Sequence, residues 1–203
     1  MSVKIKICGV TRVEDAMLAV ELGADFIGLN FHPPSPRCIA IDRAREIRIA
    51  VADRCRIVGV FVNASREYIA ERMTALRLDL IQFHGDEDEA ALEGWGVPTI
   101  RAIRLKPEDY GAPFPPTRAE YILIDRFHPQ LYGGAGRTIA LEGLRGRDLS
   151  RVFISGGLTP DNVAAAVALN PFAIDVASGV ESAPGVKHDA KLRSFFRNAK
   201  LSG

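Results

Sequence analysis

The chain has 203 residues, of which 47% are apolar and 25% are charged, and its formal net charge at pH 7 is +1. This balance excludes a disordered chain, a collagen-like chain and a coiled coil, and it does not indicate a nucleic-acid or membrane-surface partner. The length predicts one domain, residues 1–203, because domains commonly contain about 100–200 residues.

Short apolar runs alternate with amphipathic stretches from one end of the chain to the other. The runs are rich in β-branched residues and are closed by Gly, Asp, Asn or Pro, which is typical of strands. Strands are predicted over Val3–Cys8, Phe26–Phe31, Ile57–Val62, Leu80–His84, Thr99–Ile103, Tyr121–Asp125, Val152–Ser155 and Phe172–Val176. Helices are predicted near 13–22, 42–52, 66–76, 87–94, 160–169 and 188–199. The segments after the fifth and sixth strands look irregular.

Successive strand-then-helix units predict an α/β fold with a parallel sheet, because each crossover returns the next strand in the same direction. The strands are apolar at nearly every position, as expected where both faces of a sheet are buried. Eight such units can close into a (β/α)8 barrel, and an open doubly wound sheet is the alternative. The sequence therefore predicts a single-domain (β/α)8 TIM barrel.

The C-terminal ends of barrel strands carry the catalytic groups in this fold. The first strand ends at Cys8. Free cysteines are more often inert, but a thiol with a pKa of about 8.5 is already partly ionised near neutrality and can act as a base. The sixth strand ends at Asp125, on an otherwise apolar run, where burial would suit a general acid.

Asp175 is placed in the eighth strand much as Asp125 is placed in the sixth. Lys6 lies two residues before Cys8 and therefore shares its face of the first strand. If Cys8 points into the barrel, Lys6 does so too and needs a carboxylate partner. We therefore favour a pairing of Asp175 with Lys6 over a direct role of Asp175 in chemistry.

Two glycine turns follow the seventh and eighth strands. Barrels often bind phosphate at this place, through backbone N–H groups and a helix N-terminus such as the one expected at Pro160. One glycine turn alone is more simply a tight turn, but two on adjoining strands predict a phosphate site. The two turns read Ser155-Gly156-Gly157 and Ala177-Ser178-Gly179.

Arg37 lies in a proline-rich loop, where it is either a solvated charge or a ligand for a carboxylate or phosphate. His84 could orient a ligand, act as a base or cap a turn. The four histidines show no metal-ligand spacing and the three cysteines form no CxxC pair, so no metal is predicted. No nucleotide cofactor is predicted either, because GxGxxG and P-loop patterns are absent.

The chain has no apolar run of the length that spans a bilayer, and its first residues do not resemble a secretion signal. An odd number of cysteines is typical of a reducing compartment. The expected location is therefore the cytoplasm, without a membrane partner.

Seven motifs occur in one order between about residues 4 and 196: KICGVTRVEDA, FHPPSPR, GVFVN, LIQFHGDE, ILID, SGGLTPDNV and DVASGVESAPGVKH. Together they resemble the phosphoribosylanthranilate isomerase family of tryptophan biosynthesis. The resemblance implies a barrel of the phosphate-binding type. It also implies an Amadori rearrangement of N-(5-phospho-β-D-ribosyl)anthranilate to 1-(2-carboxyphenylamino)-1-deoxy-D-ribulose 5-phosphate, without a cofactor.

The resemblance also implies roles for residues of this sequence. Cys8 would be the general base and Asp125 the general acid, while Arg37 would bind the anthranilate carboxylate. The phosphate would be held by Gly156, Gly157, Ser178 and Gly179. His84 and Asp175 would line the pocket. In the implied reaction, Asp125 protonates the ribose ring oxygen, and Cys8 then removes the C2′ proton of the protonated imine.

The loop after the sixth strand departs from the family pattern. It reads Gly133-Gly134-Ala135-Gly136, where the family usually has threonine in place of Ala135, so closure over the substrate is in doubt. Two alternatives stay open. One is a related isomerase of histidine biosynthesis, which has an aspartate base at the position of Cys8, and the other is a non-catalytic phosphosugar-binding barrel. The expected partner is a small phosphorylated molecule, and the chain is expected to be a monomer or a homodimer.

Overall fold

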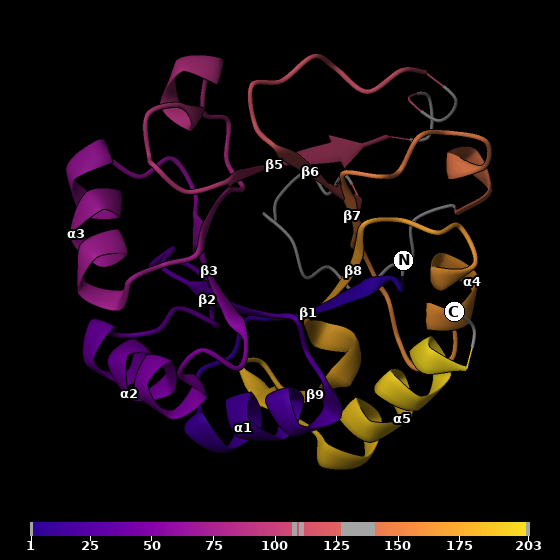
Figure 1. Ribbon diagram of the computed structural model, residues 1–203, viewed down its shortest axis with the longest axis horizontal. Helices are drawn as coiled ribbons and strands as arrows, with labels where there is room; N and C mark the ends of the chain where they lie inside the picture. The colour runs from indigo at the N-terminus through magenta and orange to yellow at the C-terminus, as the bar shows by residue number, and fades with distance from the viewer. Residues whose placement is uncertain (1, 107–108, 110–111, 127–140, 202–203) are drawn as a thin grey trace.

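The computed structural model describes residues 2–106, 109, 112–126 and 141–201. Strands β1 to β8 form a closed parallel barrel in chain order, and β8 pairs back to β1 (Figure 1). Their bounds are β1 (Lys4–Cys8), β2 (Phe26–Asn30), β3 (Arg56–Phe61), β4 (Leu80–Phe83), β5 (Thr99–Leu105), β6 (Tyr121–Arg126), β7 (Val152–Ile154) and β8 (Ala173–Val176). The predicted barrel and its eight strands are confirmed, with every bound within two residues.

The α-helices lie outside the barrel and gather beside β7, β8, β1, β2 and β3 (Figure 1). They are α1 (Val13–Leu22), α2 (Ile41–Val51), α3 (Arg66–Leu76), α4 (Val163–Val167) and α5 (Asp189–Lys200). Each was predicted, although α4 is shorter than expected because the side chain of Asn162 bonds to the loop before it. Within the described ranges, no helix is long and apolar enough to cross a membrane.

The predicted helix over 87–94 is wrong, because the structure has only the short 3-10 helix η1 (Glu89–Leu92) there. The Glu87 carboxylate accepts hydrogen bonds from the backbone of Gly85 and Asn63, which holds residue 87 in the preceding loop. After η1, Gly94 adopts a left-handed conformation with φ of 73°, which ends the turn.

Among the described residues, four further short elements were not predicted. They are η3 (Leu141–Leu144), η4 (Ser178–Val180) and an antiparallel hairpin of β9 (Glu181–Ala183) with β10 (Val186–Lys187). The hairpin follows β8 and precedes α5, so it lies beside the C-terminal ends of the barrel strands.

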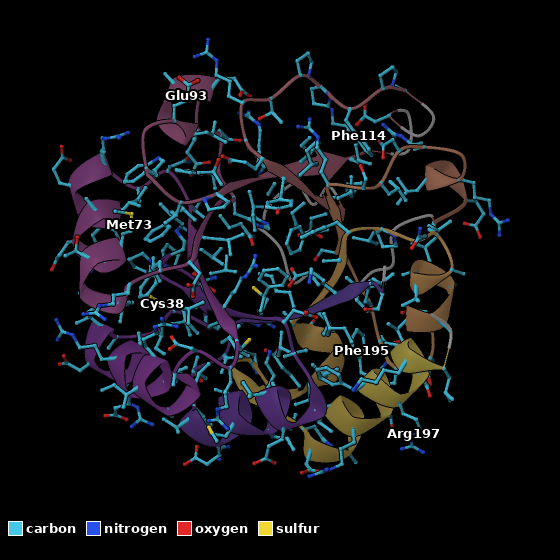
Figure 2. All side chains as sticks on the ribbon, in the orientation of Figure 1. Cys38, Met73, Glu93, Phe114, Phe195 and Arg197 are labelled. Atoms are coloured by element: carbon cyan, nitrogen blue, oxygen red, sulfur yellow. The ribbon has the colours of Figure 1, made fainter. Side chains whose placement is uncertain are left out.

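Amphipathic spacing explains how the outer helices attach to the barrel. Helix α5 buries side chains at the i, i+3, i+4 and i+7 positions, namely Leu192, Phe195, Phe196 and Ala199. Figure 2 shows Phe195 directed toward the barrel and Arg197 directed away from it. Burying a Phe or Leu side chain contributes about 1.5–3 kcal/mol.

A separate apolar cluster fills the inside of the barrel. Its buried members are Phe26, Val58, Leu80, Ile100, Ala102, Leu123, Phe153 and Ala173. One or two come from every strand except β1, which contributes the buried Lys6 instead. Side chains therefore fill this part of the barrel interior.

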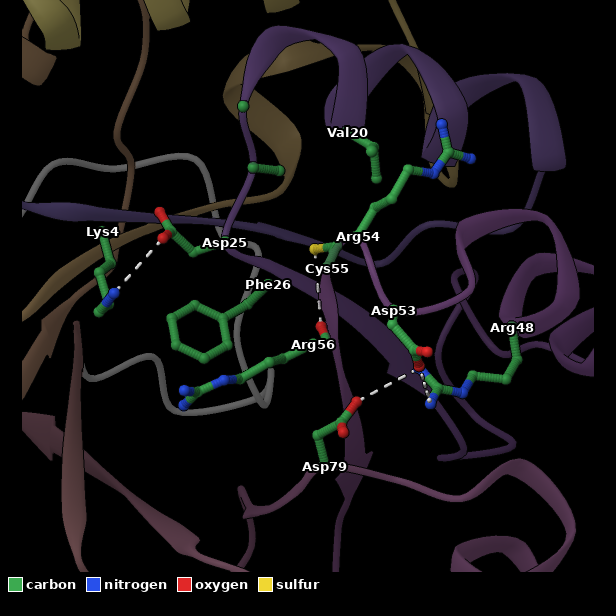
Figure 3. Close-up of a pocket in the computed structure, with 12 residues that line it drawn as sticks. Lys4, Val20, Asp25, Phe26, Arg48, Asp53, Arg54, Cys55, Arg56 and Asp79 are labelled. Atoms are coloured by element: carbon green, nitrogen blue, oxygen red, sulfur yellow. Dashed lines mark hydrogen bonds and ion pairs between the residues drawn. The ribbon is translucent and has the colours of Figure 1, made fainter.

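The N-terminal end of the barrel carries a shallow pocket of about 500 Å3 (Figure 3). Its carboxylates already have partners: Asp25 accepts from the backbone N–H of Ile5, and Asp79 accepts from that of Ile57. Burial raises the pKa of Cys55 to about 12, so this thiol stays protonated. The pocket is a structural feature, in keeping with the role of this face in barrel stability.

Candidate active site

The inward-facing side chains become polar toward the C-terminal ends of the strands. Successive inward positions lie two residues apart, so Leu123 in the apolar cluster is followed by Asp125 on the same face. Ala173 is followed in the same way by Asp175. Both aspartates are only 5% exposed. The two-residue period of the strands therefore places these carboxylates next to the apolar cluster, on its side toward the C-terminal ends of the strands.

A cavity of about 360 Å3 opens at this end of the barrel. Its lining includes five of the predicted site residues, namely Cys8, Arg37, His84, Asp125 and Asp175. The predicted phosphate residues do not line it themselves. Ser155 and Ala177, which directly precede the two glycine turns, do so. The two turns therefore adjoin the cavity at its rim.

The two glycine turns contact each other. Gly156 and Gly157 adopt left-handed conformations with φ of 86° and 75°, which other residues rarely adopt. At Gly179 a Cβ atom would lie 1.8 Å from the carbonyl oxygen of Leu158, so only glycine fits there. Glycine is thus required by the geometry of both turns.

Cys8 lies beside a buried ion pair. Lys6 Nζ donates to Asp175 Oδ1 over 2.9 Å, which confirms the pairing predicted from the strand period. Burial raises the pKa of the Cys8 thiol, and the positive charges of Lys6 and Lys187 offset this only in part. For Lys6, burial disfavours the charge, but Asp175 and Cys8 outweigh it and raise the pKa. Cys8 is therefore mostly a neutral thiol next to the ion pair of Lys6 with Asp175.

Gly28 on β2 makes room for the thiol. A Cβ atom at this position would lie 2.8 Å from Cys8 Sγ and 3.1 Å from Cys8 Cα, closer than atoms in normal contact. Sequence analysis did not single out Gly28, because only the pairing of β1 with β2 places it opposite Cys8.

Replacing Gly28 with alanine is expected to displace the thiol and lower kcat by about 10- to 100-fold, since small misplacements of a reacting group have effects of this size. Steady-state kinetics and a thermal melt check this. A protein that melts like the unaltered chain but turns over slowly is expected. Unchanged kcat would show that the thiol does not need this space.

Arg37 is held by its loop. Ser35 Oγ accepts from the backbone N–H of Arg37 over 3.2 Å and from Asn30 Nδ2 over 3.3 Å. The guanidinium is paired with Glu181 on β9, Nη2 to Oε2 over 2.7 Å. Arg37 thus lines the cavity as predicted, but part of its hydrogen-bonding capacity is already used.

His84 lies between Gln82 and Asp125. Gln82 Nε2 is 2.7 Å from His84 Nδ1, and His84 Nε2 is 3.5 Å from Asp125 Oδ2. The edge of the ring that carries Nε2 thus faces the carboxylate. His84 is therefore oriented toward Asp125.

The loop with Ala135 lies outside the described residues, so its expected effect on closure stays a prediction. The site residues that sequence analysis missed are Gly28, Glu181 and Lys187. Glu181 and Lys187 belong to the SGVESAPGVKH stretch. The motif was therefore recognised in the sequence, but neither residue was given a role.

Comparisons with known proteins agree with this geometry. Residues 5–198 match the family model of N-(5'phosphoribosyl)anthranilate (PRA) isomerase. An N-(5'-phosphoribosyl)anthranilate isomerase of Pseudomonas fluorescens strain Pf-5 is 44% identical, covering 99% of this chain and 97% of that protein.

Two crystal structures are similar over nearly all of both chains. Phosphoribosyl anthranilate isomerase from Thermotoga maritima has a TM-score of 0.85 at 35% identity, covering 98% of this chain and 99% of that one. A phosphoribosyl anthranilate isomerase in complex with reduced 1-(o-carboxyphenylamino)-1-deoxyribulose 5-phosphate has a TM-score of 0.80 at 33% identity, with coverage of 98% and 99%. The chain therefore belongs to the phosphoribosylanthranilate isomerase family, an isomerase family of tryptophan biosynthesis.

Proposed function

We propose that this chain isomerises N-(5-phosphoribosyl)anthranilate, with Cys8 as the general base and Asp125 as the general acid. The observation that carries the proposal is that both side chains face one cavity, from strands three apart around the barrel. Arg37 on the rim would bind the anthranilate carboxylate. The two glycine turns would hold the phosphate at Gly156, Gly157, Ser178 and Gly179.

Asp125 acts first in the proposed reaction. It gives a proton to the ribose ring oxygen, the C1′–O bond breaks, and the amine nitrogen supplies the electron pair that forms a protonated imine. His84 Nε2 faces the Asp125 carboxylate over 3.5 Å, and when it carries a proton it would stabilise the carboxylate that remains. No other reactant is required, because the proton stays within the site.

Cys8 acts second. Its thiolate takes the C2′ proton, and the electron pair of the broken C–H bond moves to the imine to give an enolamine. The enolamine becomes the ketone when C1′ gains a proton and the C2′ hydroxyl loses one. The positive imine makes the C2′ proton acidic, so a base of modest strength is sufficient.

The activity is expected to rise with pH through the neutral range. The pKa of Cys8 is raised by burial, so the thiolate is a minor form at neutral pH and its fraction grows with pH. Below that pKa, the thiolate fraction grows by about tenfold per pH unit, and kcat/KM should grow with it over the range in which Asp125 keeps the proton that it donates. A pH–rate profile between about pH 6 and about pH 9 checks this. A profile without a rising limb would contradict the assignment of Cys8 as base, since a falling limb belongs to the acid, Asp125.

The related isomerase of histidine biosynthesis is the second candidate. Its base is an aspartate at the end of the first strand, where this chain has Cys8, so the residue present favours the first proposal. Two parallel assays distinguish the candidate functions. One follows the loss of fluorescence from phosphoribosylanthranilate, and the other follows turnover of the histidine-pathway substrate. Turnover of the first substrate is expected, and turnover of the second alone would overturn the proposal.

The remaining proposals concern the context of the enzyme. Residues 1–203 would form one barrel domain that works without a metal or cofactor, because side chains supply both acid and base. The three free cysteines support a cytoplasmic location. Among the described residues, Ile49 and Leu201 are the large apolar side chains that are fully exposed, which supports a monomer or a homodimer.

A further inference from the structure

The β9–β10 hairpin carries two buried charges that the reaction as written does not use. Glu181 is 7% exposed and Lys187 is 5% exposed. Their side chains form an ion pair, Lys187 Nζ to Glu181 Oε1 over 2.8 Å. Burying ions costs several kcal/mol unless each has good partners, so the contacts of this pair need an explanation.

Glu181 holds one side of the Arg37 guanidinium. Arg37 Nε lies 3.0 Å and 3.2 Å from the two carboxylate oxygens, and Nη2 lies 2.7 Å from Oε2. Such a two-point contact fixes the plane of the guanidinium. Among the described residues, Arg37 Nη1 has no hydrogen-bond acceptor. This nitrogen remains for a ligand of the cavity that Arg37 lines.

Lys187 connects the Glu181 carboxylate to the backbone of Cys8, the proposed catalytic base. Its Nζ donates to the carbonyl oxygen of Cys8 over 2.6 Å and to that of Ala177 over 3.4 Å. The first carbonyl belongs to the residue that carries the thiol, and the second precedes the glycine turn after β8. Lys187 therefore connects Glu181 with the ends of two strands.

Arg37 also rests on the residue next to the thiol. A Cβ atom at Gly9 would lie 2.5 Å from Arg37 Cδ and 3.3 Å from its Cβ and Cγ. The stem of Arg37 therefore lies directly against the backbone of Gly9. The contacts therefore form a ring. Arg37 lies against Gly9 and pairs with Glu181, and Lys187 joins Glu181 to the carbonyl group of Cys8.

We propose that Glu181 and Lys187 are positioning residues, which aim the guanidinium of Arg37 at the carboxylate of the substrate and fix it relative to Cys8. The inference rests on the proposed function and names how that site recognises an aromatic carboxylate. Aiming matters because a planar guanidinium binds a carboxylate well only in a limited range of orientations.

The charges of the network support this role. Burial works against the charge of Glu181, but the hydrogen bonds from Arg37 and the charge of Lys187 outweigh it and lower the pKa of the carboxyl group. The hydrogen bond with Glu181 raises the pKa of Arg37. Burial lowers the pKa of Lys187, against the opposing effect of Glu181. Glu181 and Arg37 therefore stay ionised at neutral pH, as the pairing requires.

The test compares two ligands that differ only in the group that Arg37 is proposed to bind. They are reduced 1-(o-carboxyphenylamino)-1-deoxyribulose 5-phosphate and the same compound without its carboxyl group. Glu181→Gln keeps the size of the side chain and removes its charge. We expect binding of the first ligand to weaken by about 10- to 100-fold, the range for hydrogen bonds to charged groups, and binding of the second to stay unchanged. Equal weakening of both ligands, or of neither, would overturn the inference.

Two further variants distinguish an effect on the orientation of Arg37 from an effect on the folding of the protein. In an Arg37→Met background, Glu181→Gln should have no additional effect on the preference for the carboxylated ligand, and a full additional effect would overturn the inference. Gly9→Ala displaces Arg37 from the other side, although alanine is also strained at the φ of 66° that Gly9 adopts. In Gly9→Ala protein that melts like the unaltered chain, the selective loss should be reproduced even if Glu181→Gln does not fold. Loss of affinity for both ligands in Gly9→Ala would count against it.

Lys187→Met tests the other half of the pair. It removes the contact with the Cys8 carbonyl as well as the contact with Glu181, so both kcat and the preference between the ligands should fall. An unchanged kcat would overturn the proposed role of Lys187 in positioning Cys8.

A matched control is Glu89→Gln, which removes a glutamate paired with Arg101 over 2.7 Å, away from the cavity. It should leave the preference between the ligands unchanged, and a shift as large as that of Glu181→Gln would overturn the inference. If the unaltered protein itself binds both ligands equally, the proposed role of Arg37 fails. If it prefers the carboxylated ligand and Glu181→Gln keeps that preference, only the positioning role fails.

Discussion

Replacing Cys8 with alanine is expected to lower kcat by about 100- to 10,000-fold, because a positioned proton-transfer group contributes an effect of this size. The methyl group of alanine cannot accept the C2′ proton, and no other thiol lines the cavity among the described residues. Lys6 keeps its ion-pair partner Asp175 in this variant. KM and the melting temperature should therefore change little, and steady-state kinetics with a thermal melt measure all three quantities.

Cys38→Ala is the matched control for this variant. Cys38 is exposed and does not line the cavity, so its removal should leave kcat near that of the unaltered chain. If Cys8→Ala turned over as fast as Cys38→Ala, Cys8 could not be the base.

Replacing Asp125 with asparagine is expected to have an effect of the same order on kcat, about 100- to 10,000-fold. The amide is close in size to the carboxyl group, but it does not transfer a proton to the ring oxygen. Asp125 lies in β6 beside Arg104 of β5, and asparagine preserves that strand pairing. Ring opening should therefore fail while the barrel remains intact.

Binding of the reduced product provides the control for Asp125→Asn. This ligand is already open-chain, so its affinity should be nearly unchanged, whereas turnover should be lost. A variant that lost affinity to the same extent as turnover would indicate that Asp125 serves binding instead of ring opening.

The barrel was predictable from the sequence because its signal is local. Each strand is a short apolar run closed by a polar or glycine residue, and the period of two within a strand places Lys6 and Cys8 on one face. The same period predicted the pairing of Lys6 with Asp175, which the structure confirms. The helix expected over 87–94 failed because Glu87 is held by Asn63, a residue on another loop.

The positioning contacts were not predictable because they are not local. The hydrogen bond from Arg37 to Glu181 joins residues 144 positions apart, and the one from Lys187 to Cys8 joins residues 179 apart. Gly28 becomes meaningful only once β2 is paired with β1. The motif that contains Glu181 and Lys187 was visible, but its role depends on a hairpin that no period of the sequence indicates.

The order of the two proton transfers is the central claim, and deuterium at C2′ of the substrate tests it most directly. In Cys8→Ser the hydroxyl has a much higher pKa than the thiol and is hardly ionised, so removal of the C2′ proton should limit the rate and the deuterated substrate should react markedly more slowly. In Asp125→Asn ring opening should limit the rate, so the two substrates should react equally fast. A large isotope effect in Asp125→Asn together with none in Cys8→Ser would contradict the assignment of base and acid.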